Sequence, residues 1–212
     1  MDGPILTGLV AKGYQRAASK IGTTHNWYRG GYITPIAPAN LLGTLPAAFS
    51  PDAQFKALAK QQTLLWRAFV DTTQVQRGDI LVGTSTWVMV DGGLRPPMAM
   101  LCPQTISVAR TVQQFSQGTG ATQTTTPILA TWPCNMQLKR DKGFSEPVGF
   151  PAPSNTSAPM PEWTLYLPIL ADGVIDSGDM LTDENGATYK ADAVNFGLYG
   201  YVIACTPYEP PA

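Results

Sequence analysis

The sequence predicts a mainly β protein, in which two related small β-barrel or β-sandwich modules follow an N-terminal α-helix and a long extended arm. Three observations lead to this prediction. Charged residues make up 14% of the chain, well below the roughly 25% of ordinary soluble domains. Glycine (20 residues) and proline (19 residues) are plentiful, as expected where short strands are joined by turns. A strand-rich pattern also occurs twice in 212 residues, a length that suits one large or two small β domains.

The N-terminal helix is predicted over residues 3–21, where apolar residues recur at helical spacing. Its stripe includes Leu6, Leu9, Val10 and Tyr14, and basic and polar residues occupy the other face. An amphipathic helix needs a surface to bury its apolar stripe. We expect that surface to belong either to the same chain or to a neighbouring subunit.

The extended arm is predicted over residues 23–48, which are rich in Thr, Gly and Pro and lack periodicity. Segments of this kind are often arms that become ordered on a neighbour. Trp27, Tyr28, Arg29 and Tyr32 cluster within it, and aromatic and arginine side chains are the usual anchors of protein interfaces. We therefore expect the arm and the helix to carry most of the contact between subunits.

The remaining segments complete a four-part organisation. A short helix is predicted at about residues 51–61, with Ser50 as its cap and Pro51 in its first turn. A polar, low-complexity stretch that follows the first strand region is interpreted as a linker or surface loop. The predicted parts are residues 1–62 (helix, arm and short helix), 63–110 (first β module), 111–126 (linker) and 127–212 (second β module).

The two strand-rich regions share four features in the same order, which indicates a duplicated module. The matched features are Trp66 and Trp163, Gly78-Asp79 and Gly178-Asp179, Trp87 and Tyr189, and Cys102 and Cys205. The spacing differs by two residues between the Gly-Asp pair and the aromatic residue, and the extra residues fall at an Asn-Gly hairpin signal, Asn185-Gly186.

Each Gly-Asp pair is predicted to form a tight turn. Glycine supplies a positive φ, and the aspartate carboxylate accepts nearby backbone N–H groups. The alternative is that Asp79 and Asp179 bind calcium or act as a catalytic pair, although no acidic calcium loop surrounds either residue.

The composition argues against several classes of function. The net charge of −1 gives no whole-chain footprint for nucleic acid. A single histidine, His25, cannot supply a metal triad, and three cysteines without close spacing favour buried free thiols over a zinc site. We expect no signal peptide, no membrane span and no cofactor, and the protein to be made in a reducing cytoplasm. A two-carboxylate glycosidase using Glu162 and Asp179 remains formally open.

Several segments resemble uncharacterised structural proteins of tailed bacteriophages. These segments are residues 17–22 at the end of the helix, Tyr28-Arg29, residues 78–82 and Gly178-Asp179. Residues 183–189 are also similar to the hairpin of small β-barrel head–tail joining proteins, which are about half as long as this chain.

The resemblance implies a non-enzymatic virion protein of β-barrel type, assembled in the bacterial host cytoplasm. It implies a ring or tube at the neck or in the tail, contacting copies of itself and adjacent portal, neck or tail proteins, with no active site to transfer. The alternative is a carbohydrate- or receptor-binding module of a tail tip, in which Trp27 and Tyr28 would hold a sugar ring.

Overall fold

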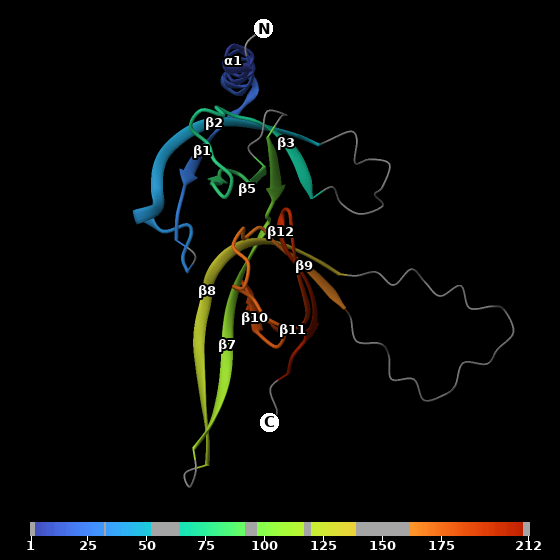
Figure 1. Ribbon diagram of the computed structural model, residues 1–212. Helices are drawn as coiled ribbons and strands as arrows, with labels where there is room; N and C mark the ends of the chain where they lie inside the picture. Colours follow the sequence, from blue (N-terminus) through green and yellow to red (C-terminus); the bar gives the residue numbers. More distant parts are fainter. Residues whose placement is uncertain are drawn as a thin grey trace, which may run out of the picture.

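The computed structural model describes residues 3–31, 33–51, 64–91, 97–116, 120–138 and 162–209. It confirms the predicted fold class, because the described chain consists of one N-terminal helix and two closed, six-stranded antiparallel β-barrels. Figure 1 shows the barrels stacked along the long axis of the molecule, with the helix at one end and a long hairpin projecting from the other.

The first barrel has the strand order β1-β2-β3-β6-β5-β4, and β4 closes it by pairing with β1. All of its neighbouring strands are antiparallel. The strands are β1 (Thr23–Tyr28), β2 (Leu41–Pro51), β3 (Leu65–Phe69), β4 (Ile80–Val82), β5 (Thr86–Asp91) and β6 (Met98–Leu101), with a short 3-10 helix, η1 (Pro38–Asn40), between β1 and β2.

The second barrel has the order β7-β8-β9-β12-β11-β10, and β10 closes it by pairing with β7. Replacing each strand number n of the first barrel by n + 6 reproduces this order. The strands are β7 (Gln104–Ser116), β8 (Gly120–Leu138), β9 (Trp163–Leu167), β10 (Met180–Asp183), β11 (Thr188–Gly197) and β12 (Gly200–Pro207).

Strand register identifies equivalent residues in the two barrels and supports the predicted duplication. Leu81 faces Trp87 in the first barrel, and Leu181 faces Tyr189 in the second. Each of these aromatic rings meets a tryptophan from β3 or β9 edge-on, with centroids 5.2 Å apart in one barrel and 6.0 Å in the other. The predicted equivalence of Trp66 with Trp163 and of Trp87 with Tyr189 is therefore confirmed.

The predicted equivalence of the cysteines is wrong by three residues. Met89 pairs with Ala99 in the first barrel, whereas the equivalent Ala191 pairs with Cys205 in the second. Cys205 thus occupies the position of Ala99. The backbone N–H of Cys102 bonds to the carbonyl of Thr86, as that of Tyr208 bonds to Thr188, which makes Cys102 the equivalent of Tyr208.

Residues 23–48 do not form an extended arm, because they contain β1 and most of β2, two of the six strands of the first barrel. Their Thr, Gly and Pro content hid these strands. Pro46 is tolerated in β2 because pairing with β3 begins only at Ala48. The predicted short helix at 51–61 lies outside the described residues except for Pro51, which ends β2.

Residues 111–126 are not a linker. The described residues on both sides of 117–119 extend β7 and β8 into one hairpin, with partners from Arg110–Thr126 to Ser116–Gly120. β7 also pairs with β10, so the second module begins at Gln104 rather than at residue 127. Threonine has a high strand propensity, which the low-complexity interpretation overlooked.

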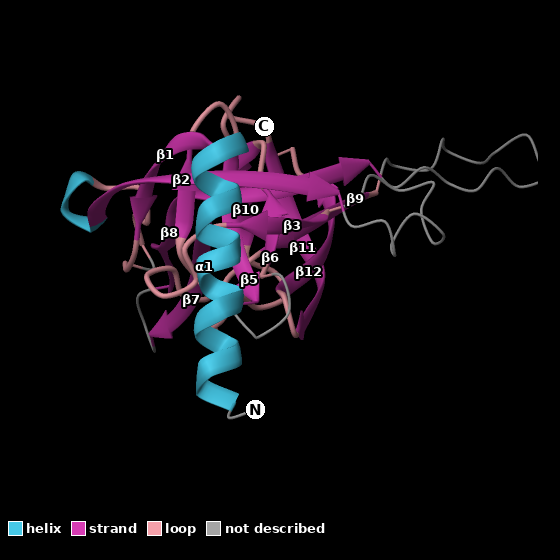
Figure 2. Ribbon diagram, turned by 90° about the horizontal axis from the view of Figure 1, so that it is seen from above, coloured by secondary structure: helices cyan, strands magenta, loops and turns pink. Residues whose placement is uncertain are grey.

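Helix α1 (Gly3–Ile21) lies across the open end of the first barrel (Figure 2) and packs against β2 and β3. Ala11 and Ala18 are buried in this contact, and the ring of Tyr14 lies 6.1 Å from that of Phe69. The partner surface of the predicted amphipathic stripe is therefore in the same chain.

Two apolar clusters fill the structure. The smaller one is the interior of the first barrel and includes Leu81, Trp87 and Met89. The larger one combines the interior of the second barrel with residues on the outside of the first, including Ile80, Val88 and Met100. The barrels therefore share the larger cluster, while the interior of the first barrel forms a cluster of its own.

Candidate functional site

The two Gly-Asp turns have the predicted geometry in both barrels. Gly78 has φ +92° and Gly178 has φ +93°, which are values that favour glycine. The carboxylate of Asp79 accepts the backbone N–H of Gln76 at 2.8 Å, and that of Asp179 accepts the N–H of Asp176 at 2.8 Å. The interpretation of these residues as structural turns is thus supported by matching bonds.

Each buried aspartate is held by an arginine that sequence reasoning did not assign to it. Arg29 donates from Nε and Nη2 to the two oxygens of Asp79, at 2.7 and 2.8 Å. Arg110 donates from the same two atoms to Asp179 at 2.7 and 2.8 Å. This bidentate geometry is the strongest form of an arginine–carboxylate pair.

The arginines come from equivalent places, directly after β1 and within β7. The carboxylates are almost fully buried, at 1% and 2% exposed, whereas each arginine side chain is 33% exposed. The hydrogen bonds and charge of the aspartate raise the pKa of each guanidinium, against the opposing effect of desolvation. Each guanidinium therefore stays charged beside the carboxylate that it binds.

The predicted interface residues have different environments. Trp27 donates its indole N–H to Asp79 at 2.9 Å, Arg29 lies over the Trp27 ring at 5.1 Å, and Tyr28 packs against the larger core cluster. These three side chains are used inside the fold, which leaves Trp27 poorly placed as a flat sugar-binding surface.

The interface residues predicted in the helix also differ from one another in exposure. Leu9 is 61% exposed, while Val10 and Tyr14 are half-buried. The backbone of Leu6 lies in α1, and Tyr32 lies outside the described residues. Among the predicted contact residues whose side chains the structure describes, Leu9 is the exposed one.

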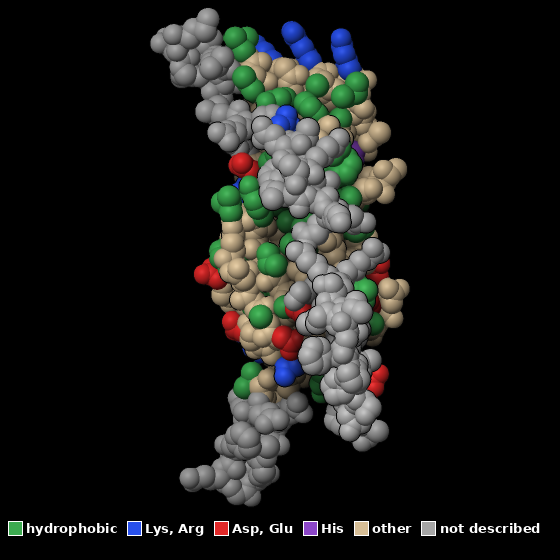
Figure 3. Space-filling model, turned by 90° about the vertical axis from the view of Figure 1, so that its right-hand side faces the viewer, with side chains coloured by type: hydrophobic (Ala, Val, Ile, Leu, Met, Phe, Trp, Pro, Cys, Tyr) green, Lys and Arg blue, Asp and Glu red, His purple; other side chains and the backbone are tan. Residues whose placement is uncertain are grey.

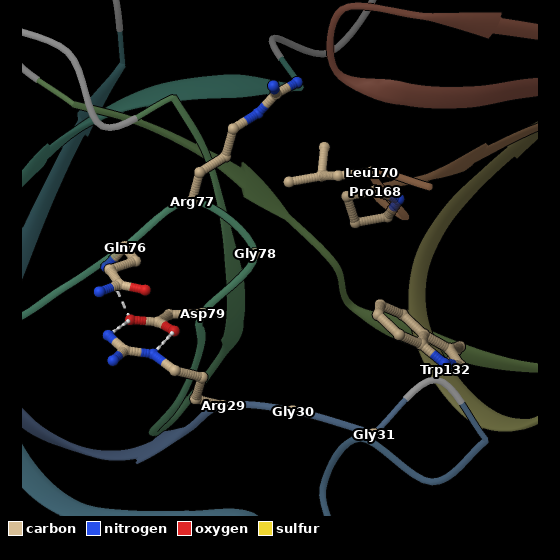
Figure 4. Close-up of a pocket in the computed structure, with 10 residues that line it drawn as sticks. All are labelled: Arg29, Gly30, Gly31, Gln76, Arg77, Gly78, Asp79, Trp132, Pro168 and Leu170. Atoms are coloured by element: carbon tan, nitrogen blue, oxygen red, sulfur yellow. Dashed lines mark hydrogen bonds and ion pairs between the residues drawn. The ribbon is translucent and has the colours of Figure 1, made fainter. Parts of the chain in front are cut away.

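A cavity of about 230 Å³ lies where the two barrels meet. Figure 4 shows the Gly78 turn and the Gly30-Gly31 segment on one side and Trp132 with Pro168 on the other. The Arg77 side chain points away from this space and bonds to the carbonyl groups of Val90 and Leu198. Arg29 and Asp79 are also paired to each other. We therefore interpret the cavity as a structural feature of the junction between the two barrels.

The carboxylates left open as a glycosidase pair are Glu162 and Asp179. Asp179 is committed to Arg110, so the suggested partnership of Glu162 with Asp179 has no free carboxylate on one side. Among the residues that the structure describes, no group of three His, Cys, Asp or Glu side chains is placed to hold a metal ion.

The β7–β8 hairpin leaves the second barrel at Arg110 and Thr126. β10 pairs with β7 only up to Ala109, and β9 pairs with β8 only from Asn135 onward. Beyond these points the described strands of the hairpin pair only with each other (Figure 1). Thr111 and Thr125 face each other across it, with hydroxyl oxygens 3.1 Å apart.

Comparisons with protein-family models, curated proteins and solved structures found no match. Within the described part of the chain, no helix has both the length and the apolar character needed to cross a membrane.

Proposed function

We propose that this chain is a non-enzymatic structural protein of a tailed phage particle, which forms a ring or tube at the head–tail junction or in the tail by self-association. The observation that carries self-association is the projecting β7–β8 hairpin. The assignment to a phage particle is supported by the sequence resemblance described above.

The hairpin is suited to contact another subunit because both of its outer edges carry backbone N–H and C=O groups that pair with no other described strand. Exposed edges of this kind readily pair with another chain. An isolated two-stranded hairpin is also only marginally stable in water. Packing against a neighbour would therefore stabilise the hairpin as well as the assembly.

The first barrel shows how the equivalent segment is used. Residues 29–40 connect β1 to β2, as the hairpin tip connects β7 to β8, and two described residues of this connection contact the second barrel. The carbonyl of Ile33 accepts the backbone N–H of Ala130 in β8 at 2.7 Å, and Ile36 packs against the larger core cluster. In this fold, the connection at this position thus already contacts a neighbouring barrel.

A shortened hairpin tests self-association. Residues 112–124 are replaced by Asn-Gly, which joins the facing residues Thr111 and Thr125 by a two-residue turn. We expect the variant to keep its fold by circular dichroism and to lose the large species that the natural protein forms in sedimentation velocity. The matched control removes Asn185 and Gly186 from the β10–β11 turn and should assemble normally.

Two results would contradict the proposal. A folded variant that assembles as well as the natural chain would show that the hairpin is not the contact. Purified phage particles that carry no label in immunogold microscopy, with antibody against this chain, would remove the virion role.

A further inference from the structure

The contact between the two barrels shows which outer surface this module uses for docking. One row on the outside of the first barrel consists of apolar residues that face each other across β1, β4, β5, β6 and β3. These residues are Tyr28, Ile80, Val88, Met100 and Leu65, and all of them belong to or pack against the core shared with the second barrel.

The equivalent row of the second barrel contains polar residues at positions where the first barrel has apolar ones. Strand register places Lys190 at the position of Val88 and Thr206 at that of Met100. Beside them, the exposed Asp192 occupies the β11 bulge, where the first barrel has the buried Val90. Ala109 and Met180 keep apolar side chains at the positions of Tyr28 and Ile80. This end of the second barrel, which docks on no other described barrel and is called the free end below, is therefore more polar than the docked face of the first barrel.

Two exposed aspartates, Asp176 and Asp192, lie at the free end together with Lys190. Asp176 is 61% exposed although it bonds to Arg110, and Asp192 is exposed as well. The two residues belong to adjacent segments, since the hydroxyl of Ser177 donates to the carbonyl of Asp192 at 3.1 Å and Gly178 N–H donates to Ala191 at 2.7 Å.

The opposite end of the molecule carries a basic helix face. Lys12, Arg16 and Lys20 are exposed and follow each other at intervals of four residues, so they lie on one side of α1. Leu9 lies on the same side, three residues before Lys12, and is 61% exposed. Ala11 and Ala18 hold the other side of α1 on the barrel.

The net charges of the two halves of the chain differ in the same direction. Residues 1–103 contain nine Lys or Arg and five Asp or Glu, whereas residues 104–212 contain five and ten. The two parts thus have net charges of +4 and −5. Figure 3 shows Lys and Arg side chains gathered at the α1 end of the face in view, and Asp and Glu side chains over the second barrel.

We infer that copies of this chain associate head to tail, with the basic face of α1 in one copy docked against the acidic free end of the second barrel in the next. The inference rests on the proposed self-association, and it adds a contact between these two surfaces to the contact that the β7–β8 hairpin makes. Repeated contacts between two different surfaces of identical chains generate a closed ring when the rotation closes and an open helical filament when it does not. Complementary charge selects this orientation, because head-to-head and tail-to-tail contacts juxtapose like charges.

The α1 surface is tested by the combined substitution Lys12→Glu, Arg16→Glu and Lys20→Glu. All three positions are exposed, so circular dichroism should be unchanged. We expect association to weaken by roughly 100-fold or more in sedimentation velocity, because like charges then meet across the interface. Association of the natural chain should also weaken as NaCl is raised from about 0.05 M to about 0.5 M.

A charge swap tests whether the partner of α1 is a second copy of this chain. A second variant carries Asp176→Lys and Asp192→Lys and should also fail to assemble by itself. An equimolar mixture of the two variants should recover assembly, because each acidic helix face then meets a basic barrel end. Combining all five substitutions in one chain should recover it as well.

The outcomes separate this inference from the function on which it depends. If the natural chain stays monomeric at every concentration, self-association itself fails. If the natural chain assembles and the helix variant assembles equally well, only the head-to-tail inference is overturned. Failure of the mixture to recover assembly, or a helix variant that self-assembles but no longer enters particles, would overturn the second copy as the partner of α1.

Discussion

At the residue scale, the most informative feature is the arginine–aspartate pair that occurs once in each barrel. Asp79 and Asp179 each accept two bonds from an arginine and one from a backbone N–H three residues earlier. Neither aspartate is exposed by more than 2%. A buried carboxylate is tolerated only when it is paired and hydrogen-bonded, so the pair fixes the turn that leads into β4 or β10.

Arg110→Ala should therefore destabilise the protein by about 2–4 kcal/mol, because it leaves Asp179 buried without its counter-charge. Arg29→Ala should have an effect of similar size through Asp79. Urea unfolding followed by circular dichroism measures both. Asp192→Asn, at an exposed position, is the control and should change the free energy of unfolding by less than about 0.5 kcal/mol. Equal effects of the control and Arg110→Ala would refute the structural role of the pair.

The three cysteines give a second prediction at this scale. Cys102, Cys134 and Cys205 are buried free thiols. Burial, with smaller contributions from nearby ionisable groups, raises the pKa of all three, that of Cys205 to about 12. A thiol reacts as the thiolate, so Ellman's reagent should label none of them in the native protein and all three in denaturant.

The same pKa shifts set a pH dependence. In the unfolded chain the thiols ionise near their ordinary pKa of about 8.5, whereas in the folded protein they remain protonated. The stabilisation is fully present below that pH and should be lost as the pH rises above it. Thermal melts between about pH 7 and about pH 10 would measure the decline. Replacing Cys205 by Ala should reduce its slope, and an unchanged slope would contradict the assignment.

At the element scale, the seating of α1 on the first barrel depends on a glycine at the helix end. A Cβ atom on Gly22 would lie 2.4 Å from the carbonyl oxygen of Ala18 and 2.8 Å from the backbone of Ala47 in β2. Gly22 therefore permits the close approach of the helix end and β2. By contrast, a Cβ on Gly13, within the exposed part of the same helix, would meet nothing within 4 Å.

These two glycines form a matched pair for mutation. Gly22→Ala should destabilise the protein by about 1–3 kcal/mol, since backbone atoms must move to admit the methyl group. Gly13→Ala should stabilise it by about 0.5–1 kcal/mol through higher helix propensity. Thermal unfolding of the two variants checks both signs. Equal shifts in Tm would show that the helix end does not pack as closely as described.

At the scale of the whole molecule, the two barrels should unfold as one unit because they share a core. Val88 is fully buried on the outside of the first barrel, and its equivalent in the second barrel is the exposed Lys190. This difference between two copies of one module marks the surface on which barrel docking depends.

Exchanging these residues tests the shared core. Val88→Lys should destabilise the protein by at least ~3 kcal/mol, because it buries a charge without a partner, and should split calorimetric unfolding into two transitions. Lys190→Val, the reciprocal change at the free end, should leave stability within about 0.5 kcal/mol of the natural chain. A single unshifted transition in Val88→Lys would contradict docking through this surface.

Local patterns in the sequence determined the helix, the fold class, the duplication and the Gly-Asp turns. The tertiary structure decided the rest. Residues 23–28, 41–48, 111–116 and 120–126 form strands and pair with neighbouring strands. Thr favours strands, but local sequence does not say which strand each segment pairs with. The arginine partners of Asp79 and Asp179 lie 50 and 69 residues away in sequence. Only closure of each barrel brings them together, since sheet pairing is non-local.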